Sequence, residues 1–354
     1  KMINNHMTHL EDVLFESLDK VKTLFNQMLD DIEANNYDNF SVKIDGSPSI
    51  IIGVEDDQFF VATKSLFNKV PIKYTKIEDF NTIKEASLRD KLISVFENYK
   101  GTIKNGIYQG DLLFTEKDVE LVKNDQETYI TFCPNIIIYR LYENVQNQNI
   151  ENLRIGVAWH TSYRREITGE LTKHSQAPIQ SFFQAKEQIL NIFPTYSSLC
   201  KGTWRPIIKK PINNINFDNF TLSPHLHYLS KVINHSIRKN NDFSPMMSKE
   251  HFDILIDQMA DIEINKRKTE SVKQRIREHF DEVKQHITEA HCKIYYEVIG
   301  YKNLLFNYIH TPSNKSLITV DEISFHEGFV YKDIKIVLRH HFSAMNFLRH
   351  AKNN

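Results

Sequence analysis

Apolar residues near the N-terminus recur at the spacing of one helix face. Between residues 8 and 34 they occupy every third or fourth position, at Leu10, Val13, Leu14, Leu18, Val21, Leu24, Phe25, Met28 and Ile32. Thr8 and Glu11 stand three residues apart at the start of this run, in the arrangement of a capping box. The pattern predicts one amphipathic helix over residues 8–34.

The apolar period changes to two between about residues 40 and 163. Short runs rich in Val, Ile, Phe and Tyr, bounded by turn residues, predict strands. These runs are Phe40–Ile44, Ser49–Val54, Gln58–Thr63, Gly106–Phe114, Tyr129–Leu141 and Leu153–His160. One helix is predicted within this region, near Ile83–Tyr99.

Helical spacing returns from about residue 179 to residue 308, most clearly in Lys249–Met259 and Ser271–Phe306. The last part of the chain returns to strand patterning at Glu327–Tyr331 and Ile334–Leu338, and then closes with a short helix. Lys332 and Asp333 between these two strands predict a hairpin turn, although the preferred glycine is missing.

This order of elements predicts an α+β protein. A mostly antiparallel sheet domain is interrupted by a large helical insertion and completed by the last hairpin. The predicted domain ranges are 1–178 and 311–354 for the sheet domain and 179–310 for the helical accessory domain. A chain of 354 residues, 41% hydrophobic and 25% charged, is long enough for two such cores.

Charge and cysteine usage narrow the functional classes. The formal net charge of −1 excludes a protein that is basic overall, so any nucleic-acid surface must be local. Cys133, Cys200 and Cys292 lie far apart without a C-x-x-C pair, which argues against a disulfide framework and favours a reducing compartment. Neither an 18-residue apolar run nor a signal-peptide pattern is present, so we expect a cytoplasmic protein without a membrane partner.

The segment Lys43-Ile-Asp-Gly46 carries the most specific candidate chemistry. Residues two apart in an extended segment point to the same side, so Lys43 and Asp45 should face one pocket. A lysine amine attacks phosphorus only when deprotonated, and burial or nearby cations lower its pKa toward that state. Gly46 permits close approach of backbone or ligand.

Further candidates follow in order along the chain. Gly110-Asp111 lies late in a predicted strand, and Thr63-Lys64-Ser65 follows another. Glu327 precedes the closing hairpin, and Lys335 lies on its return strand. Each of these alone is typical of a polar strand end. Together with Lys43 they indicate a pocket for a nucleotide and its phosphates.

These motifs resemble those of the covalent nucleotidyltransferase superfamily, which contains ATP-dependent DNA and RNA ligases and mRNA capping enzymes. Lys43-Ile-Asp-Gly46 matches its K-x-D-G motif, and Glu327-Gly-Phe-Val330 matches its E-G-x-V motif. The intervening and final motifs are matched by Lys64, Gly110-Asp111, Tyr139 and Lys335. Asp111 stands where the family usually has Glu, and Lys64 where it usually has Arg.

The resemblance implies a fold, a reaction and a role for each residue. The sheet domain would be an ATP-grasp-like ligase domain in which Lys43 attacks the α-phosphorus of ATP, helped by Lys335. Tyr139 would stack on the base, while Asp111 and Glu327 would hold Mg²⁺, with Mn²⁺ as an alternative ion. Contacts to the nucleotide, in addition to those of Lys43 and Tyr139, would come from Asp45, Gly46, Lys64, Asp111, Glu327, Lys332 and Lys335.

A polynucleotide ligase acting on RNA ends rather than DNA ends is the function that the resemblance favours. The segments Phe132-Cys-Pro-Asn135 and Val157-Ala-Trp-His-Thr161 are also similar to those of ligase-like proteins of large tailed phages, which suggests a phage-encoded protein. Two alternatives stay open. The adenylate could pass to another acceptor, as in capping or in protein or small-molecule adenylylation, or the protein could bind nucleic acid without catalysis.

Because only about fifteen residues follow Leu338, we expect no counterpart of the family's usual oligonucleotide-binding barrel. The helical region offers a basic stretch with little apparent opposing charge, formed by Lys266, Arg267, Lys268, Lys273, Arg275 and Arg277. Phosphate binding and a solvated helix face explain that stretch equally well. Among 16 histidines, no pair shows metal-ligand spacing on a predicted helix; His286 and His291, for example, are five apart.

Overall fold

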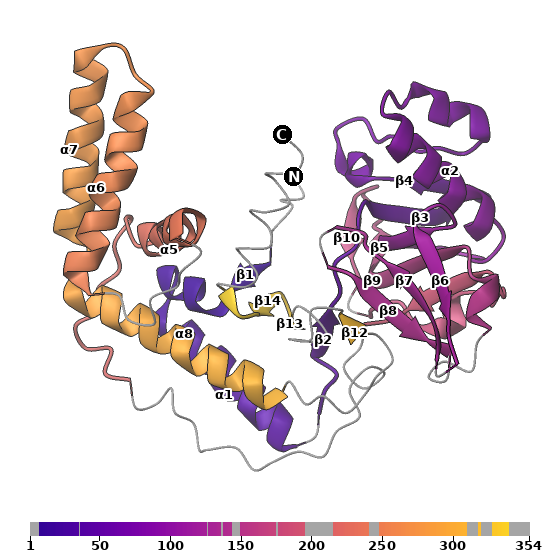
Figure 1. The fold of residues 1–354 in the computed structure, drawn as a ribbon, viewed down its shortest axis with the longest axis horizontal. Coiled ribbons are helices and arrows are strands. Elements are labelled where there is room, and N and C mark those ends of the chain that lie inside the picture. The colour runs from indigo at the N-terminus through magenta and orange to yellow at the C-terminus, as the bar shows by residue number, and fades with distance from the viewer. Residues whose placement is uncertain are drawn as a thin grey trace. The chain divides into compact units, whose positions relative to one another are not determined.

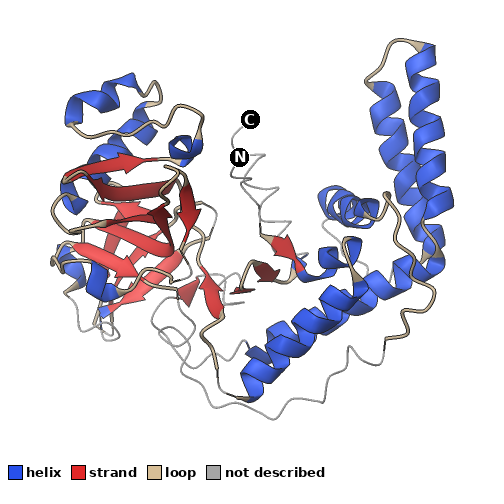
Figure 2. Cartoon of the chain, turned by 180° about the vertical axis from the view of Figure 1, so that it is seen from behind, coloured by secondary structure: helices blue, strands red, loops and turns tan. Residues whose placement is uncertain are grey.

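The chain divides into two compact units in a computed structural model. It describes residues 7–34, 36–125, 127–135, 137–143, 149–174, 176–194, 215–240, 248–309, 318–319 and 328–339. Unit 1 contains Val42–Gly202 with Pro312–Glu327 and Lys1–Asn4, and unit 2 contains Asn5–Ser41, Thr203–Thr311 and Gly328–Asn354. The protein is α+β as predicted, with strands predominating in unit 1 and helices in unit 2 (Figure 2). The units are divided differently from the predicted domain ranges, since the N-terminal and closing segments are grouped with the helices.

A six-stranded sheet forms the centre of unit 1 (Figure 1). Its strand order is β10-β9-β5-β3-β4, and β11 also pairs with β9. The strands are β3 (Ser49–Glu55), β4 (Gln58–Ala62), β5 (Gly106–Thr115), β9 (Ile155–Arg165), β10 (Leu171–Lys173) and β11 (Ile189–Ile192). All neighbours are antiparallel except β11 and β9, which run parallel. β11 lies in the region predicted to be helical, so that prediction is wrong there.

Each face of this sheet is covered by its own apolar cluster. Alternation along β3 sends Ile50 and Ile52 to one face and Ile51 to the other. The first face packs against α2 (Ala86–Tyr99), whose buried residues include Leu92 and Phe96. The second face carries a smaller cluster and, at one end of the sheet, the polar residues described below. Short 3₁₀ turns, η2 (Lys64–Phe67) and η3 (Ile77–Thr82), connect β4 to α2.

A second sheet of unit 1 has the order β12-β8-β7-β6. Its strands are β6 (Val119–Lys123), β7 (Thr128–Phe132), β8 (Tyr139–Tyr142) and β12 (Ile318–Thr319). The prediction of one strand over Tyr129–Leu141 is wrong, because the segment forms β7 and β8 as an antiparallel pair. Pro134 lies in the connection between them and lacks the N–H that a continuing strand needs.

The N-terminal segment is not the single helix that its spacing predicts. It forms β1 (Thr8–His9), the 3₁₀ helix η1 (Leu10–Phe15) and then α1 (Leu18–Glu33). α1 is capped by Ser17, whose side chain accepts the N–H of Lys20 at 3.3 Å. The predicted capping box at Thr8 and Glu11 is therefore wrong, because Glu11 is buried in a charge network instead of facing a helix end.

Unit 2 contains the helices α5 (His227–Asn240), α6 (Lys249–Asn265), α7 (Glu270–His286) and α8 (Glu289–Ile309). Figure 1 shows α6 and α7 side by side as a helical hairpin. The helical predictions at Lys249–Met259 and Ser271–Phe306 are confirmed, and the second run is divided between α7 and α8. Thr288 separates them, since its Oγ1 accepts the N–H of His291 at 3.3 Å and begins α8.

The predicted closing hairpin is confirmed within the described residues. β13 (Gly328–Tyr331) and β14 (Ile334–Ile336) pair antiparallel, in a four-stranded sheet of order β1-β14-β13-β2. Lys332 occupies the left-handed region with φ of 55°, which replaces the missing turn glycine. β2 (Phe40–Lys43) begins in unit 2, and its last two residues belong to unit 1. The predicted closing helix after Leu338 falls outside the described residues.

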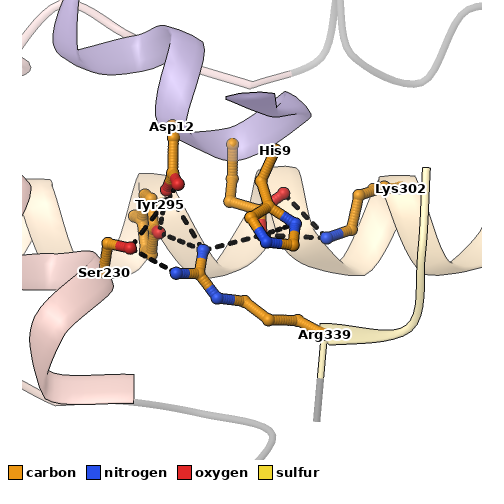
Figure 3. A network of polar contacts seen from close by, with 7 residues as sticks. His9, Asp12, Ser230, Tyr295, Lys302 and Arg339 are labelled. Carbon is orange, nitrogen blue, oxygen red and sulfur yellow. Dashed lines mark hydrogen bonds and ion pairs between the residues drawn. The ribbon is translucent and has the colours of Figure 1, made fainter. Parts of the chain in front are cut away.

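A buried network of charged side chains holds together distant segments of unit 2 (Figure 3). Lys302 on α8 donates to Glu11 Oε1 at 2.8 Å, and Arg339 Nη1 donates to the same oxygen at 3.0 Å. Arg339 also contacts Asp12 Oδ1 at 3.1 Å, the Tyr295 hydroxyl at 2.8 Å and the Ser230 hydroxyl. The two cations and two carboxylates balance, so burial of the group is electrostatically compensated.

Among the described residues, no helix is both long enough and apolar enough to cross a membrane.

Candidate active site in unit 1

Lys43 and Asp45 lie close together at the end of β2. The Lys43 Nζ is 3.8 Å from Asp45 Oδ1, which is the distance of an ion pair. The side chains are 11% and 26% exposed, so the amine is largely shielded while the carboxylate stays accessible. β2 ends at Lys43 and Asp45 follows it in a loop. The predicted juxtaposition of the two side chains is thus present.

Two side chains, one from β8 and one from the connection between β7 and β8, hold the loop that carries Asp45. The Asp45 N–H donates to the Tyr139 hydroxyl at 3.2 Å. Asn135 Nδ2 donates to Asp45 Oδ2 at 2.8 Å and to the Gly46 carbonyl at 3.3 Å. Asn135 therefore fixes both the carboxylate and the backbone that follows it.

Gly46 packs directly against the backbone of β5. A Cβ at this position would lie 2.6 Å from Leu112 O and 2.8 Å from Asp111 Cβ. The Ser47 N–H donates to Leu112 O at 2.8 Å, and the Leu112 N–H donates to Pro48 O at 3.0 Å. These contacts bring the Lys43 segment beside Asp111, although the two are more than sixty residues apart in sequence.

Gly110 allows a similarly close approach on the other side of β5. A Cβ on Gly110 would lie 2.6 Å from Ala158 O and 2.8 Å from the Trp159 ring. The glycine that precedes Asp111 is thus required by the packing of β5 on β9.

A β-bulge directs His160 toward Asp111. Thr161 of β9 pairs with Gln109 of β5 and Trp159 pairs with the next residue, so His160 is the extra residue of the bulge. Its Nε2 lies 3.7 Å from Asp111 Oδ1, an ion pair when the imidazole is protonated. Its Nδ1 lies 2.7 Å from Thr161 Oγ1. The bulge thereby places an imidazole beside one of the predicted site carboxylates.

A chain of polar contacts crosses the same face of the sheet. Gln109 Nε2 donates to Ser49 Oγ at 2.9 Å, and the Tyr163 hydroxyl donates to Gln109 Oε1 at 2.5 Å. Gln109 and Asp111 are two apart on β5 and therefore point to the same face. Burial raises the pKa of Tyr163, so its hydroxyl remains a hydrogen-bond donor at neutral pH.

Lys64 follows β4 at the same end of the sheet. Ile51 on β3 pairs with Ala62 of β4 on one side and with Gln109 of β5 on the other. Lys64 is therefore in line with Ser49 and lies exposed at the start of η2. The topology brings the predicted phosphate-binding lysine to the sheet end that carries Asp111.

Tyr139 is fully buried on β8, with none of its surface exposed. Its ring stacks on Phe132, with centroids 5.6 Å apart, and its hydroxyl holds the Asp45 loop. In this structure the side chain positions the loop. The predicted stacking on a base stays a prediction.

Three predicted nucleotide contacts are not among the described residues of unit 1. Glu327 falls outside the described residues, and Lys332 and Lys335 belong to unit 2. Lys332 Nζ contacts Gln27 Oε1 at 3.3 Å, and Lys335 on β14 is paired with Val330 of β13. The roles expected for these three residues stay predictions.

The basic stretch of unit 2 is more neutral than its sequence suggests. Glu263 lies 2.7 Å from Lys266 and 3.8 Å from Arg267, and Glu270 lies 3.7 Å from Lys273 and 2.8 Å from Arg277. The expectation of little opposing charge is wrong, because helical spacing brings Glu263 at the end of α6 and Glu270 at the start of α7 beside these bases. Within the part of the chain that the structure describes, Lys268 and Arg275 form no ion pair. Binding of nucleic acid by this stretch stays a prediction.

A family model matches residues 4–352, almost the whole chain. The chain belongs to DUF6267, a family of unknown function. Searches of curated proteins and of solved structures each find no significant match. Membership in DUF6267 therefore leaves the chemistry to be argued from the residues themselves.

Two site residues of this DUF6267 protein, Asn135 and His160, lie in the segments that are similar to ligase-like phage proteins, but no local pattern predicts a role for either. Asn135 lacks a local signal because its partners Asp45 and Gly46 are about ninety residues away. The role of His160 depends on a bulge, and alternation along the predicted strand does not reveal one.

Proposed function

We propose that this protein is an ATP-dependent polynucleotide ligase acting on RNA ends, and that unit 1 is its nucleotidyltransferase domain. The observation that carries the proposal is the meeting of Lys43, Asp45 and Asp111 at one end of the sheet. The K-x-D-G segment predicts Lys43 as the nucleophile, and the contacts of Gly46 with β5 bring this segment beside Asp111, the carboxylate of the predicted Gly110-Asp111 motif.

In the first step the neutral Lys43 amine, having lost a proton to solvent, would attack the α-phosphorus of ATP. A nitrogen–phosphorus bond forms, the bond to the bridging oxygen breaks, and pyrophosphate leaves with the electron pair. The lysyl adenylate then passes AMP to the 5′-phosphate of an RNA strand. In the final step the 3′-hydroxyl of a second strand attacks that phosphate, which seals the strands and releases AMP.

The carboxylates of unit 1 suit a hard cation such as Mg²⁺. Asp45 and Asp111 are partly exposed, with side chains 26% and 21% accessible, and both offer oxygen ligands. Mg²⁺ would supply charge neutralisation at the phosphates. Asp45 is already oriented by Asn135, and His160 stands beside Asp111, so the protein's own groups prearrange both carboxylates.

Lysine adenylylation is tested with α-³²P-labelled ATP and Mg²⁺. Wild-type protein should retain label through denaturing electrophoresis, and the label should be released by acid, as expected for a phosphoramidate. Lys43→Arg keeps the positive charge but should abolish labelling. Lys73→Arg is the matched control, because Lys73 pairs with Glu55 at the opposite end of β3. The covalent mechanism fails if wild type takes up no label or if Lys43→Arg labels equally well.

The acceptor is tested separately with 5′-phosphorylated RNA and DNA strands. Sealed RNA is the expected product, with DNA sealed less efficiently. Labelled protein that seals neither polymer would instead establish adenylylation with a different acceptor. Replacing ATP by GTP in the labelling step distinguishes a ligase from a capping-type enzyme, since only the latter should prefer GTP.

A further inference from the structure

A cluster of metal-ligating side chains lies in unit 2 at the start of α5. His225, Glu282 and His286 each offer one ligand atom, and these atoms all lie within 4.8 Å of one another. Glu282 and His286 are four apart on α7 and therefore share a helix face. His225 Nε2 approaches Glu282 Oε1 at 3.3 Å from the turn that precedes α5.

The hydrogen bond of His286 favours metal binding by its imidazole. His286 Nδ1 lies 2.8 Å from the backbone carbonyl of Glu282, which can only accept, so Nδ1 carries the proton. This leaves the lone pair on His286 Nε2, the arrangement in which metal-bound histidines are commonly held. His225 is buried, whereas Glu282 and His286 are exposed. One ligand is thus fixed by packing, and the other two can adjust.

His279 lies one turn before Glu282 on α7. It is a neighbour of the cluster but is not one of its three ligand residues. Its Nε2 is 2.7 Å from the Tyr228 hydroxyl, and its ring lies 5.9 Å from that of His225. The pairing with Tyr228 holds this imidazole in place beside the three ligands.

We propose that His225, Glu282 and His286 form a binding site for a divalent transition metal ion, with Zn²⁺ as the preferred ion. Two imidazoles and one carboxylate suit zinc better than Mg²⁺ or Ca²⁺, which favour all-oxygen sites. Tetrahedral zinc requires donor atoms roughly 3.3 Å apart, so the donors, now within 4.8 Å of one another, would have to approach by rotation of the exposed Glu282 and His286 side chains. Three protein ligands leave a fourth position for water.

The bound ion would connect α7 to the turn before α5, two segments more than fifty residues apart in sequence. A metal that binds only the folded state stabilises it, so zinc should raise the melting temperature of the protein.

The site is tested with full-length, tag-free protein, because an affinity tag rich in histidine would bind zinc itself. The chain is stripped with chelator and incubated with Zn²⁺, and bound zinc is then measured by elemental analysis and by competition with a chromophoric chelator. One zinc per chain is expected. Co²⁺ in place of Zn²⁺ should give the intense visible absorption of a four- or five-coordinate site.

His286→Gln is the first variant, since His286 is exposed and its loss leaves the core intact. It should weaken zinc binding by at least about 100-fold, as should Glu282→Gln. His227→Gln is the matched control: His227 lies two residues from His225, and its Nδ1 contacts the Pro224 carbonyl at 2.9 Å instead of the cluster. The proposal is overturned if wild type binds no zinc under these conditions, or if His286→Gln and Glu282→Gln bind it as tightly as His227→Gln.

Discussion

Gly46 belongs to the predicted K-x-D-G motif of unit 1 and also packs directly against β5. Its lack of a side chain allows the Lys43 segment to lie against β5, where a Cβ would come within 2.6 Å of a backbone oxygen. Backbone atoms cannot rotate away as a flexible side chain does. The requirement for glycine here is therefore steric.

We expect Gly46→Ala to lower the free energy of unfolding by about 1–3 kcal/mol, because the added methyl overpacks the contact with Asp111 and Leu112. The measurement is urea denaturation, with lysine labelling from ATP as a second readout. Gly300→Ala in α8 is the control, since a Cβ there meets no atom within 4 Å. That variant should be more stable than wild type by up to about 1 kcal/mol. Equal stability of both variants would contradict the steric argument.

At the scale of elements, Asn191 joins three pieces of unit 1. It lies on β11, and its Oδ1 accepts from Trp159 Nε1 of β9 at 2.8 Å and from the Tyr99 hydroxyl of α2 at 2.9 Å. Trp159 and Tyr99 are both fully buried. Burial raises the pKa of Tyr99 far above its usual value, which keeps the hydroxyl protonated as a donor.

Asn191→Ala should destabilise unit 1 by about 1–3 kcal/mol for each of the two donors that it leaves unpaired. Urea unfolding followed by tryptophan fluorescence reports on this, because Trp159 sits in the core beside the substitution. Asn98→Ala is the control: the Asn98 amide donates to Ser94 O within α2 itself. Its effect should stay within about 0.5 kcal/mol, and a loss as large as that of Asn191→Ala would argue against a special role for β11.

At the scale of the whole molecule, buried ion pairs connect segments that are far apart in the sequence. The partners of Glu11 in unit 2 are Lys302 and Arg339, which are 291 and 328 residues away. The side chains of Glu11 and Lys302 are both fully buried. Loss of one charge leaves the others uncompensated in a medium that solvates them poorly.

Glu11→Gln should therefore cost about 3–5 kcal/mol in the free energy of unfolding of the protein. Glu16→Gln provides the matched control, because Glu16 pairs with Lys20 at the surface, where the side chains are 59% and 51% exposed. An exposed pair of this kind contributes less than about 1 kcal/mol. Chemical denaturation monitored by circular dichroism measures both, and similar losses in the two variants would contradict the argument from burial.

The same network predicts a dependence on pH. Burial by itself raises the pKa of Glu11, but the attraction of Lys302 and Arg339 outweighs it and holds the pKa well below the usual 4.5. A carboxyl group whose pKa is depressed by folding contributes stability that is complete above its unfolded pKa and is lost as the pH falls below it.

The difference in stability between wild type and Glu11→Gln should thus be constant above about pH 6 and shrink as the pH falls from about 5 toward 3. Denaturation curves of both proteins across this range provide the test. Burial raises the pKa of the neighbouring Asp12, which acts in the opposite direction, and the charge of Glu11 adds to that rise, so Glu11→Gln also lowers the opposing contribution of Asp12. A difference that does not change with pH would mean that folding leaves the pKa of Glu11 unchanged, and a difference that increases in favour of wild type as the pH falls would mean that folding raises it.

Local patterns in the sequence determined much of what the structure contains. Alternation located β3, β4 and β5, and the turn at Lys332 located the closing hairpin, because strand faces and turns depend on neighbouring residues. The K-x-D-G spacing alone predicted that the side chains of Lys43 and Asp45 lie on the same side of the extended segment. It also placed the candidate chemistry in the sheet-rich part of the chain.

Only the tertiary structure decided which side chains meet across long separations. Helical spacing of the first residues could not reveal that Glu11 leaves the helix to join Arg339, and no local signal connects His225 to His286. Asn135 and His160 acquire their positions from a loop contact and a bulge. The physical reason is the same in each case: the environment of a polar side chain depends on partners that folding supplies, whereas the face of a strand or helix on which it lies depends on its immediate neighbours in sequence.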